Sequence, residues 1–243
     1  MQTIGMTEVL YMDDSYLAET EAKIISRNLI DNTWIVQLDR TVFYPKGGGL
    51  LSDSGWLVHD GKEYNVPEVY KFKGEVYHVI DEEPPEVGSS IVARIDWDRR
   101  YAMMRYHTAA HVLASRFYKI GAKITGNQIT PERARFDFNL PEFNRDTIEE
   151  LVRETNTYLG QDIPVEVFYM KREDVLNNPE LIKLAEASPP DVEVLRIVKI
   201  GDVDIQADGG PHVKNLREVP PIKILKMENK GRNNRRVYFV FDE

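Results

Sequence analysis

Hydrophobic and polar residues alternate in short runs through the first 95 residues of the chain. The runs are rich in β-branched and aromatic side chains, which favour the pleated surface of a β-sheet. Strands are expected at 34–38, 41–44 and 91–95, with turn signals at 53–55, 60–61 and 73–74. Short strands at this spacing predict a small β-barrel-like domain over residues 1–95.

After Ile95 the pattern changes to mixed helix and strand. Apolar positions spaced i, i+4, i+7 and i+11 predict a helix over 98–119, with Asp96 or Asp98 as its N-cap and Gly121 just past its end. Its apolar face is Tyr106, Ala110, Leu113 and Phe117, and a second helix over 143–159 has the inward stripe Ile148, Leu151, Val152 and Thr155. Strands are expected over 134–138, 165–168, 194–205 and 237–241. The predicted fold is therefore α+β, with an N-terminal β-barrel-like domain at 1–95 and an α+β domain at 96–243.

Composition narrows the class of protein. The chain has 243 residues, 42% of them hydrophobic and 29% charged, as in ordinary globular proteins. It has no cysteine, which excludes disulfides, a thiolate nucleophile and cysteine-based metal sites. No apolar run approaches the roughly 20 residues of a membrane helix, and the N-terminus does not resemble a signal peptide. We expect a soluble cytoplasmic protein with no membrane partner.

Charge is unevenly distributed along the chain. The net charge of −9 argues against non-specific binding of DNA or other nucleic acid by the whole surface. Residues 222–236 nevertheless carry +5, so the remainder carries −14. This segment is either a local patch that attracts one polyanion or a solvated turn between two strands.

Two histidines lie one turn apart on the first predicted helix. His107 and His111 are spaced i, i+4, so both imidazoles lie on one side, where they can hold a single metal ion. Simple packing also explains many such pairs. A helical zinc protease requires Glu directly after the first histidine, and Thr108 stands there instead.

A second pair of metal-type residues flanks the glycine turn that ends the strand near residue 205. Asp208 and His212 are four residues apart, and the intervening Gly209 and Gly210 allow the two side chains to converge. Both residue types are good zinc ligands, although an ordinary Asp-Gly turn is the alternative. Two converging pairs in one domain favour a metal site.

Three consecutive glycines, Gly47, Gly48 and Gly49, form the third feature. Such a run weakens a strand, so it suits either close approach of the backbone to a ligand or a flexible hairpin tip.

Together these features resemble the alanyl-tRNA editing family, which includes freestanding proteins and the editing domain of alanyl-tRNA synthetase. The resemblance runs over nearly the whole chain and is carried by residues 41–53, 96–111 and 206–218. A β-barrel-like module before an α+β editing domain resembles the medium-length freestanding members. The resemblance implies an editing domain of the threonyl/alanyl-tRNA synthetase type. It also implies ATP-independent hydrolysis of serine, or glycine, from mischarged tRNA(Ala) with a zinc-activated water.

The resemblance assigns roles to particular residues. One zinc ion per chain is expected at His107, His111, Asp208 and His212. Asp208 and Thr41 are expected to be catalytic, and the substrate is expected to contact Thr41, Gly47, Gly48 and Gly49. Phosphate contacts are expected from a group of basic residues: Arg99, Arg100, Arg105, Lys223, Lys226, Arg232, Arg235 and Arg236.

The chain departs from the family pattern at three positions. Leu50 replaces a glutamine, Asp208 replaces a cysteine ligand, and Pro211 replaces a threonine. Asp208 is either a fourth ligand or a nearby carboxylate that accepts a proton. Two other functions stay open: an editing-like module that only binds tRNA or a protein partner, and a metal-dependent hydrolase of small esters or amides. The sequence leaves the oligomeric state open.

Overall fold

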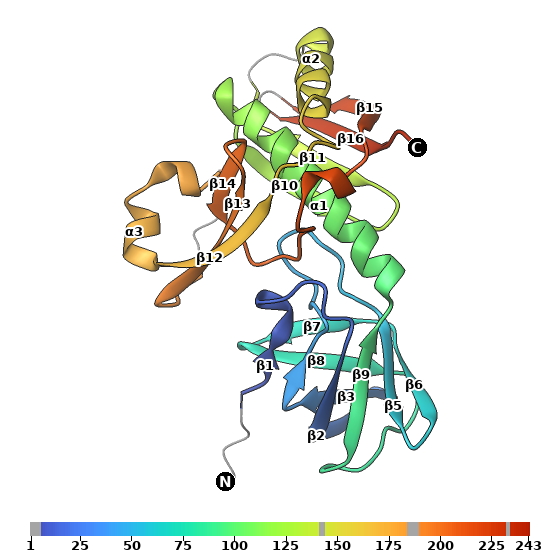
Figure 1. Ribbon diagram of the computed structural model, residues 1–243. Helices are drawn as coiled ribbons and strands as arrows, with labels where there is room; N and C mark the ends of the chain where they lie inside the picture. Colours follow the sequence, from blue (N-terminus) through green and yellow to red (C-terminus); the bar gives the residue numbers. More distant parts are fainter. Residues whose placement is uncertain (1–5, 141–143, 184–189, 232–233) are drawn as a thin grey trace. The chain divides into compact units, whose positions relative to one another are not determined.

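The chain folds into two compact units, Met1–Tyr101 and Ala102–Glu243 (Figure 1). This is a computed structural model that describes residues 6–140, 144–183, 190–231 and 234–243. The boundary falls inside helix α1 (Trp97–Lys119), a few residues beyond the one expected near Ile95. The fold is α+β. No helix in the described ranges is both long and apolar enough to cross a membrane.

The first unit is built almost entirely of strands. These are β1 (Glu8–Val9), β2 (Glu19–Ile30), β3 (Thr33–Leu38), β4 (Arg40–Thr41), β5 (Gly55–His59), β6 (Lys62–Val66), β7 (Val69–Phe72), β8 (Glu75–Ile80) and β9 (Ser90–Ile95), with a 3-10 turn η1 at Leu10–Met12. Seven strands form one sheet in the order β6-β5-β9-β2-β3-β8-β7, and β1 pairs in parallel with β4.

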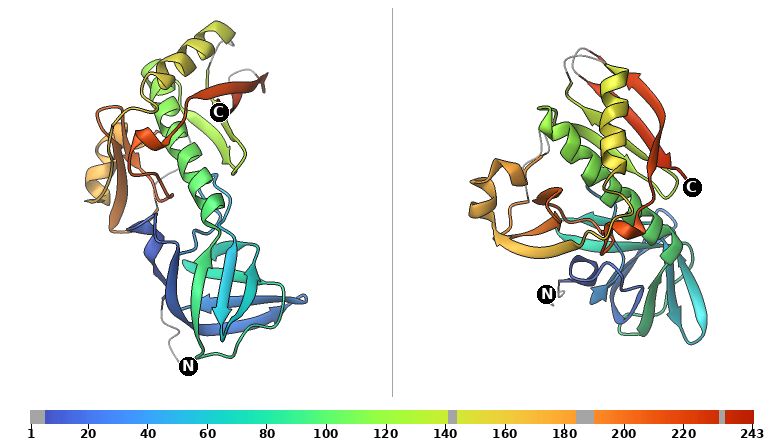
Figure 2. Two further views of the ribbon diagram at one scale, coloured as in Figure 1. Left: turned by 45° about the vertical axis from the view of Figure 1, so that its right-hand side comes forward. Right: turned by 45° about the horizontal axis from the view of Figure 1, so that its top comes forward.

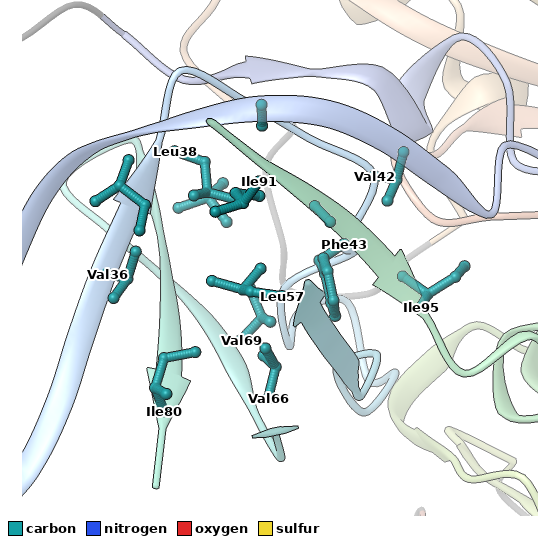
Figure 3. Close-up of a cluster of buried hydrophobic side chains, with 14 residues drawn as sticks. Val36, Leu38, Val42, Phe43, Leu57, Val66, Val69, Ile80, Ile91 and Ile95 are labelled. Atoms are coloured by element: carbon teal, nitrogen blue, oxygen red, sulfur yellow. The ribbon is translucent and has the colours of Figure 1, made fainter. Parts of the chain in front are cut away.

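Strand β2 explains the shape of this sheet. Its first half pairs with β9 and its second half with β3, and the register shifts between Ile24 and Ser26. Such a bulge bends a strand and increases its twist. The two halves of the sheet enclose one apolar core, which includes Leu57 and Ile91 from one half and Val36 and Ile80 from the other (Figure 3). The barrel-like expectation needs correction, because no strand pairing among the described residues joins β6 to β7 and the sheet is open.

The predicted turns and strands of this unit agree with the structure at most positions. Hairpins turn at Asp60-Gly61 and Lys73-Gly74, whose four residues have positive φ. The strand expected over 41–44 is wrong beyond Thr41. Its next residues are buried in the core, and the Tyr44 amide donates to the Asp53 carboxylate instead of a neighbouring strand.

The second unit combines two sheets with helix α1. Its other elements are β10 (Ile124–Ile129), β11 (Ala134–Phe138), α2 (Arg145–Asn156), β12 (Val165–Lys171), α3 (Arg172–Leu176), η2 (Pro179–Leu181), β13 (Val194–Ile200), β14 (Asp204–Ala207), η3 (Leu216–Glu218), β15 (Ile222–Asn229) and β16 (Arg235–Phe241). The sheets have the orders β10-β11-β16-β15 and β12-β13-β14.

Both predicted helices form, and their predicted apolar stripes are buried. Helix α2 is capped by the side chain of Asn144, while Phe143, the first residue of the expected helix, lies outside the described residues. The single strand expected over 194–205 is in fact two, β13 and β14, because the chain turns back at Gly201.

Helix α1 runs between the two sheets of this unit (Figures 1 and 2). On one side the Phe117 ring stacks on Phe138 of β11, with centroids 3.7 Å apart. On the other side His111 contacts Asp204 of β14. Burial on both sides explains why nearly all of α1 from Met103 to Phe117 is buried and why polar residues there must find partners inside the unit.

Candidate metal centre

Helix α1 positions two of the candidate ligands. It begins after Asp96, whose carboxylate accepts the Arg99 amide and caps the first turn. One helical turn separates His107 from His111, and both are buried. Their rings lie nearly perpendicular, with centroids 4.7 Å apart. The helix therefore brings both Nε2 atoms to one side, as the i, i+4 spacing predicts.

The loop after β14 supplies the other two. Gly210 lies against the His107 ring, where a Cβ atom would come within 2.5 Å of His107 Cε1. Because only glycine fits there without displacing the ring, the loop can continue to His212, whose imidazole stacks on His107 at 4.0 Å. The Gly210 amide also donates to Asp208 Oδ1 at 2.6 Å. The loop thus brings Asp208 and His212 to the same point.

We call His107, His111, Asp208 and His212 the His–Asp cluster. One ligand atom from each lies within 4.8 Å of all the others. The Asp208 carboxylate oxygens lie 3.6, 3.7 and 3.4 Å from Nε2 of His107, His111 and His212. A tetrahedral zinc centre with bonds of about 2.0–2.1 Å has ligand atoms about 3.4 Å apart. The distances from Asp208 are near this spacing, so the residues fit a tetrahedral metal ion.

Each histidine is also held through its outer nitrogen. His107 Nδ1 lies 3.1 Å from the carbonyl oxygen of Pro211, which can only accept, so this nitrogen carries the proton. His111 Nδ1 lies 3.2 Å from Asp204 Oδ2, and His212 Nδ1 lies 3.0 Å from Thr108 Oγ1. Outer partners of this kind orient metal-binding imidazoles and fix their tautomers.

Buried charge shifts the pKa values within the cluster. Burial alone would lower the pKa of His111, but hydrogen bonds and charge from Asp204 and Asp208 outweigh it and raise that pKa to about 9. Burial and the neighbouring histidines hold the pKa of His212 well below its ordinary value. Burial would raise the pKa of Asp208, yet the surrounding histidines hold it well below the usual range. Asp208 is therefore a carboxylate and His212 a neutral imidazole at neutral pH.

Two cationic side chains support the cluster from inside the fold. Arg196 of β13 donates to the carbonyl oxygens of Asp208 and Gly210 at 2.9 and 3.0 Å, which fixes the loop. Lys183 is buried and ion-paired with Asp204, the outer partner of His111. Three imidazole nitrogens and one carboxylate are a donor set typical of zinc.

The glycine-rich segment lies in the first unit and forms a tight, anchored turn. Gly47 and Leu50 exchange two backbone hydrogen bonds, and Gly48 and Gly49 have φ of +58° and +88°. Glycine adopts these left-handed conformations without strain, which explains the run of glycines locally. Leu50, one of the departures from the family pattern, is buried.

Thr41 is buried in the same unit. Its Oγ1 lies 2.8 Å from His78 Nε2 and accepts the Phe43 amide at 3.1 Å. The structure therefore gives Thr41 partners within the protein, and its predicted contact with substrate stays a prediction.

The predicted phosphate-binding residues lie in very different environments. Arg100 is fully buried on Asp53, and Arg235 is also buried, so neither guanidinium is accessible to a phosphate group. Arg99, Arg105 and Arg236 are partly buried, and Arg236 forms an ion pair with Asp137. Lys223 and Lys226 have well-exposed side chains on β15. Arg232 lies outside the described residues.

Five residues at the site have no role predicted from the sequence: Thr108, Lys183, Arg196, Asp204 and Gln206, whose side-chain amide nitrogen lies 2.8 Å from His111 Nδ1. A signal existed for Asp204, because Asp204 and Gln206 are buried polar residues two apart on the strand that leads to Asp208. Such alternation places polar side chains on the buried face of a strand, where they need partners.

Fold and site together define an α+β protein with a buried cluster of three histidines and a carboxylate arranged for a metal ion. Two family models match the chain. Residues 195–238, which include Asp208 and His212, match the threonyl and alanyl tRNA synthetase second additional domain. Residues 8–99 match the class II (A) tRNA synthetases.

Curated relatives extend this similarity over nearly the whole chain. The alanyl-tRNA editing protein AlaX-M of Saccharolobus solfataricus is 46% identical over 97% of this chain and 99% of its own length. The proteins of the same name from Methanosarcina barkeri and Methanosarcina acetivorans are 43% and 41% identical, with the same coverage. The chain belongs to the family of alanyl-tRNA editing proteins of the AlaX-M type, which confirms the resemblance inferred from its motifs.

Proposed function

We propose that this protein hydrolyses the ester bond between a wrong amino acid and tRNA(Ala), with serine or glycine as the amino acid. The relatives are named alanyl-tRNA editing proteins. The observation that carries the proposal is the His–Asp cluster, in which four ligand-type atoms gather within 4.8 Å in a chain of this family. The proposal makes the protein an aminoacyl-tRNA deacylase.

Zinc is the metal that we propose for the cluster, one ion per chain. When bound, it would polarise the ester carbonyl and lower the pKa of water toward about 7. The chain contributes three imidazole nitrogens, whose outer hydrogen bonds hold the rings in place, and His111, whose pKa of about 9 keeps it protonated without metal, would release a proton when the metal binds. It also surrounds the cluster with buried side chains, and electrostatic interactions are stronger in such a water-excluded site than in water.

We propose Asp208 as the proton acceptor of the reaction. Its side chain is 24% exposed, whereas the three histidine side chains are 1–7% exposed. Asp208 is therefore the member of the cluster on the side open to solvent. As a carboxylate it can accept a hydrogen bond and then a proton from the attacking water, and it can also act as a weak fourth ligand.

Selection of serine over alanine requires a polar partner for the serine hydroxyl. A synthetase pocket cannot strongly exclude a side chain that adds only a hydroxyl, so a second site must recognise that group. We propose Thr41 for this role, together with the backbone of Gly47, Gly48 and Gly49. Support comes from the family resemblance of this segment and from the anchored turn that holds it.

Binding of the tRNA backbone is proposed for exposed and partly exposed basic side chains. Lys223 and Lys226 on β15 have the most accessible side chains of this group, and Arg99, Arg105 and Arg236 are partly exposed. Contacts of this kind supply affinity that falls with salt but little sequence specificity.

The proposal is tested with tRNA(Ala) charged with serine, glycine or alanine. We expect rapid release of serine or glycine and slow release of alanine. A His107→Ala/His111→Ala double variant that is folded by circular dichroism serves as control and should be inactive. If zinc-loaded protein binds tRNA but releases no amino acid, the binding-module alternative is correct. Hydrolysis of small esters with no action on charged tRNA would favour the small-ester hydrolase.

A further inference from the structure

Thr108 lies between two ligands of the His–Asp cluster without being a ligand itself. It directly follows His107 on α1 and is fully buried. Its Oγ1 lies 2.9 Å from the carbonyl oxygen of Met104, 3.3 Å from the amide of Val213 and 3.0 Å from His212 Nδ1. One hydroxyl thus links the helix with the loop that carries His212.

The protons on these atoms can be assigned from their chemistry. The Met104 carbonyl can only accept, so the single hydroxyl proton of Thr108 is directed to it. The Thr108 oxygen is then an acceptor for the Val213 amide and for a proton on His212 Nδ1. With Nδ1 protonated, neutral His212 has its lone pair on Nε2, which faces Asp208 at 3.4 Å. That is the form a metal ion requires.

We propose that Thr108 is a positioning residue that fixes the ring and the tautomer of His212 and thereby sets the affinity of the cluster for zinc. This inference rests on the metal site of the proposed function. It does not depend on which aminoacyl-tRNA is hydrolysed.

The other two histidines have different outer partners, which makes the role of Thr108 specific. His107 is held by a backbone carbonyl and His111 by the carboxylate of Asp204. Only His212 depends on a hydroxyl, and the same hydroxyl also holds the adjacent Val213 amide. Loss of this one oxygen therefore removes a hydrogen bond from the His212 ring and another from the backbone of the loop that carries it.

Thr155 offers a matched control elsewhere in the unit. It is a fully buried threonine on α2 whose hydroxyl donates to the Leu151 carbonyl at 2.8 Å, the same bond to the preceding turn that Thr108 makes. Thr155→Val removes that bond far along the chain from the His–Asp cluster. A comparison of the two valine variants separates the contact with His212 from the general effect on a helix.

The test measures zinc affinity by chelator competition and the visible spectrum of the cobalt(II)-substituted protein. Thr108→Val should bind zinc about 10–100-fold more weakly and show an altered cobalt spectrum. Thr108→Ser, which keeps the hydroxyl, should restore both readouts, and Thr155→Val should leave them as in the parent protein. Unchanged affinity and spectrum in folded Thr108→Val would overturn the proposal, as would an equal loss in Thr155→Val.

A measurement on the parent protein decides the matter if Thr108→Val does not fold. Long-range nitrogen–proton NMR of the zinc-loaded protein should show His212 protonated at Nδ1. Protonation at Nε2 would contradict the proposal. Because neither readout uses tRNA, zinc binding that depends on Thr108 without serine release would disprove the proposed reaction and leave this inference standing.

Discussion

Thr41 and His78 form a buried pair that shows how single residues of the first unit are held. His78 Nδ1 lies 3.2 Å from the carbonyl oxygen of Val36, which leaves Nε2 to accept the proton of Thr41 Oγ1. Burial, only partly offset by the Val36 hydrogen bond, lowers the pKa of His78 from 6.5 to about 4. His78 is therefore neutral at physiological pH, as its hydrogen bond with Thr41 requires.

This shift predicts a pH-dependent stability. Between pH 6.5 and about 4 the unfolded chain binds a proton at His78 that the folded chain does not. The contribution of His78 is thus complete above pH 6.5 and is lost as the pH falls toward 4, by about 3 kcal/mol. All three tryptophans, Trp34, Trp56 and Trp97, belong to the first unit, so their fluorescence follows its unfolding in denaturant.

The comparison that isolates His78 uses His78→Gln. The free energy of unfolding of the parent protein should fall more steeply between pH 6.5 and 4 than that of the variant. Parallel curves would show that His78 does not titrate abnormally.

Thr41 has both a structural partner and a proposed substrate role, and two variants separate them. Thr41→Val leaves His78 Nε2 and the Phe43 amide without their partner, which should destabilise the first unit by about 1–3 kcal/mol. It should also slow serine release from tRNA(Ala) at a temperature where the variant is folded, whereas Thr41→Ser should keep most of the rate. If Thr41→Val is destabilised but releases serine normally, Thr41 has only the structural role.

Asp208 can be tested by its effect on metal content. Three histidines with fixed outer partners supply three nitrogen ligands, which is enough to bind a catalytic zinc ion. Asp208→Ala should therefore retain zinc, though more weakly, and slow serine release by about 100-fold or more. Asp208→Cys should hold zinc at least as firmly, because thiolate is a strong zinc ligand. Nearly complete loss of zinc from Asp208→Ala would make Asp208 an essential ligand.

At the scale of elements, the loop after β14 determines the site. It must pass close to α1 for His212 to reach His107 and His111, and Gly210 is where this approach is tightest. A Cβ atom at Gly210 would also come within 2.9 Å of His107 Nδ1, the nitrogen that donates to Pro211.

Gly210→Ala should therefore weaken zinc binding by about tenfold or more, because the His107 ring must move. Gly126→Ala is a suitable control. Its φ is also not positive, and its added Cβ would meet only the Asp137 side chain, 3.1 Å away on the four-stranded sheet. Zinc affinity in Gly210→Ala equal to that of the control would mean that the loop is not constrained at this point.

The pattern of apolar and polar residues determines some of the predicted elements better than others. The helices at α1 and α2 follow from apolar periodicity, and both predicted stripes are buried. The strand expected over 41–44 is wrong beyond Thr41 because the Tyr44 amide donates to the Asp53 side chain, nine residues later, and not to a neighbouring strand. The expected barrel is an open sheet because pairing between strand edges depends on bends such as the bulge in β2, which no local pattern specifies.

The site shows the same limit. The histidine spacing and the Gly-Gly turn predict the members of the His–Asp cluster, which the structure brings together. Thr108 and Asp204 were missed because their roles depend on contacts between segments far apart in sequence. Arg196 was missed because its role depends on how β13 lies beside the loop after β14. Burial of Arg100 and Arg235 was also missed. A basic residue is expected to be exposed unless the groups that pair with it are known.

On the scale of the whole molecule, the charge is distributed so that one basic segment can attract a polyanion while the acidic remainder repels others. The net charge is −9, whereas residues 222–236 carry +5. The segment includes strand β15 and the start of β16, which pair antiparallel, and its single acidic residue, Glu228, pairs with Lys226 and Lys230.

The proposed hydrolysis depends on a metal held by the His–Asp cluster. The most direct test is to remove metal from the protein, add zinc back in steps from zero to one equivalent per chain, and measure serine release from tRNA(Ala) at each step. We predict no release without metal and a rate that rises in proportion to bound zinc until one equivalent is present. Full activity in the metal-free protein, or a rate that does not follow zinc occupancy, would contradict this account.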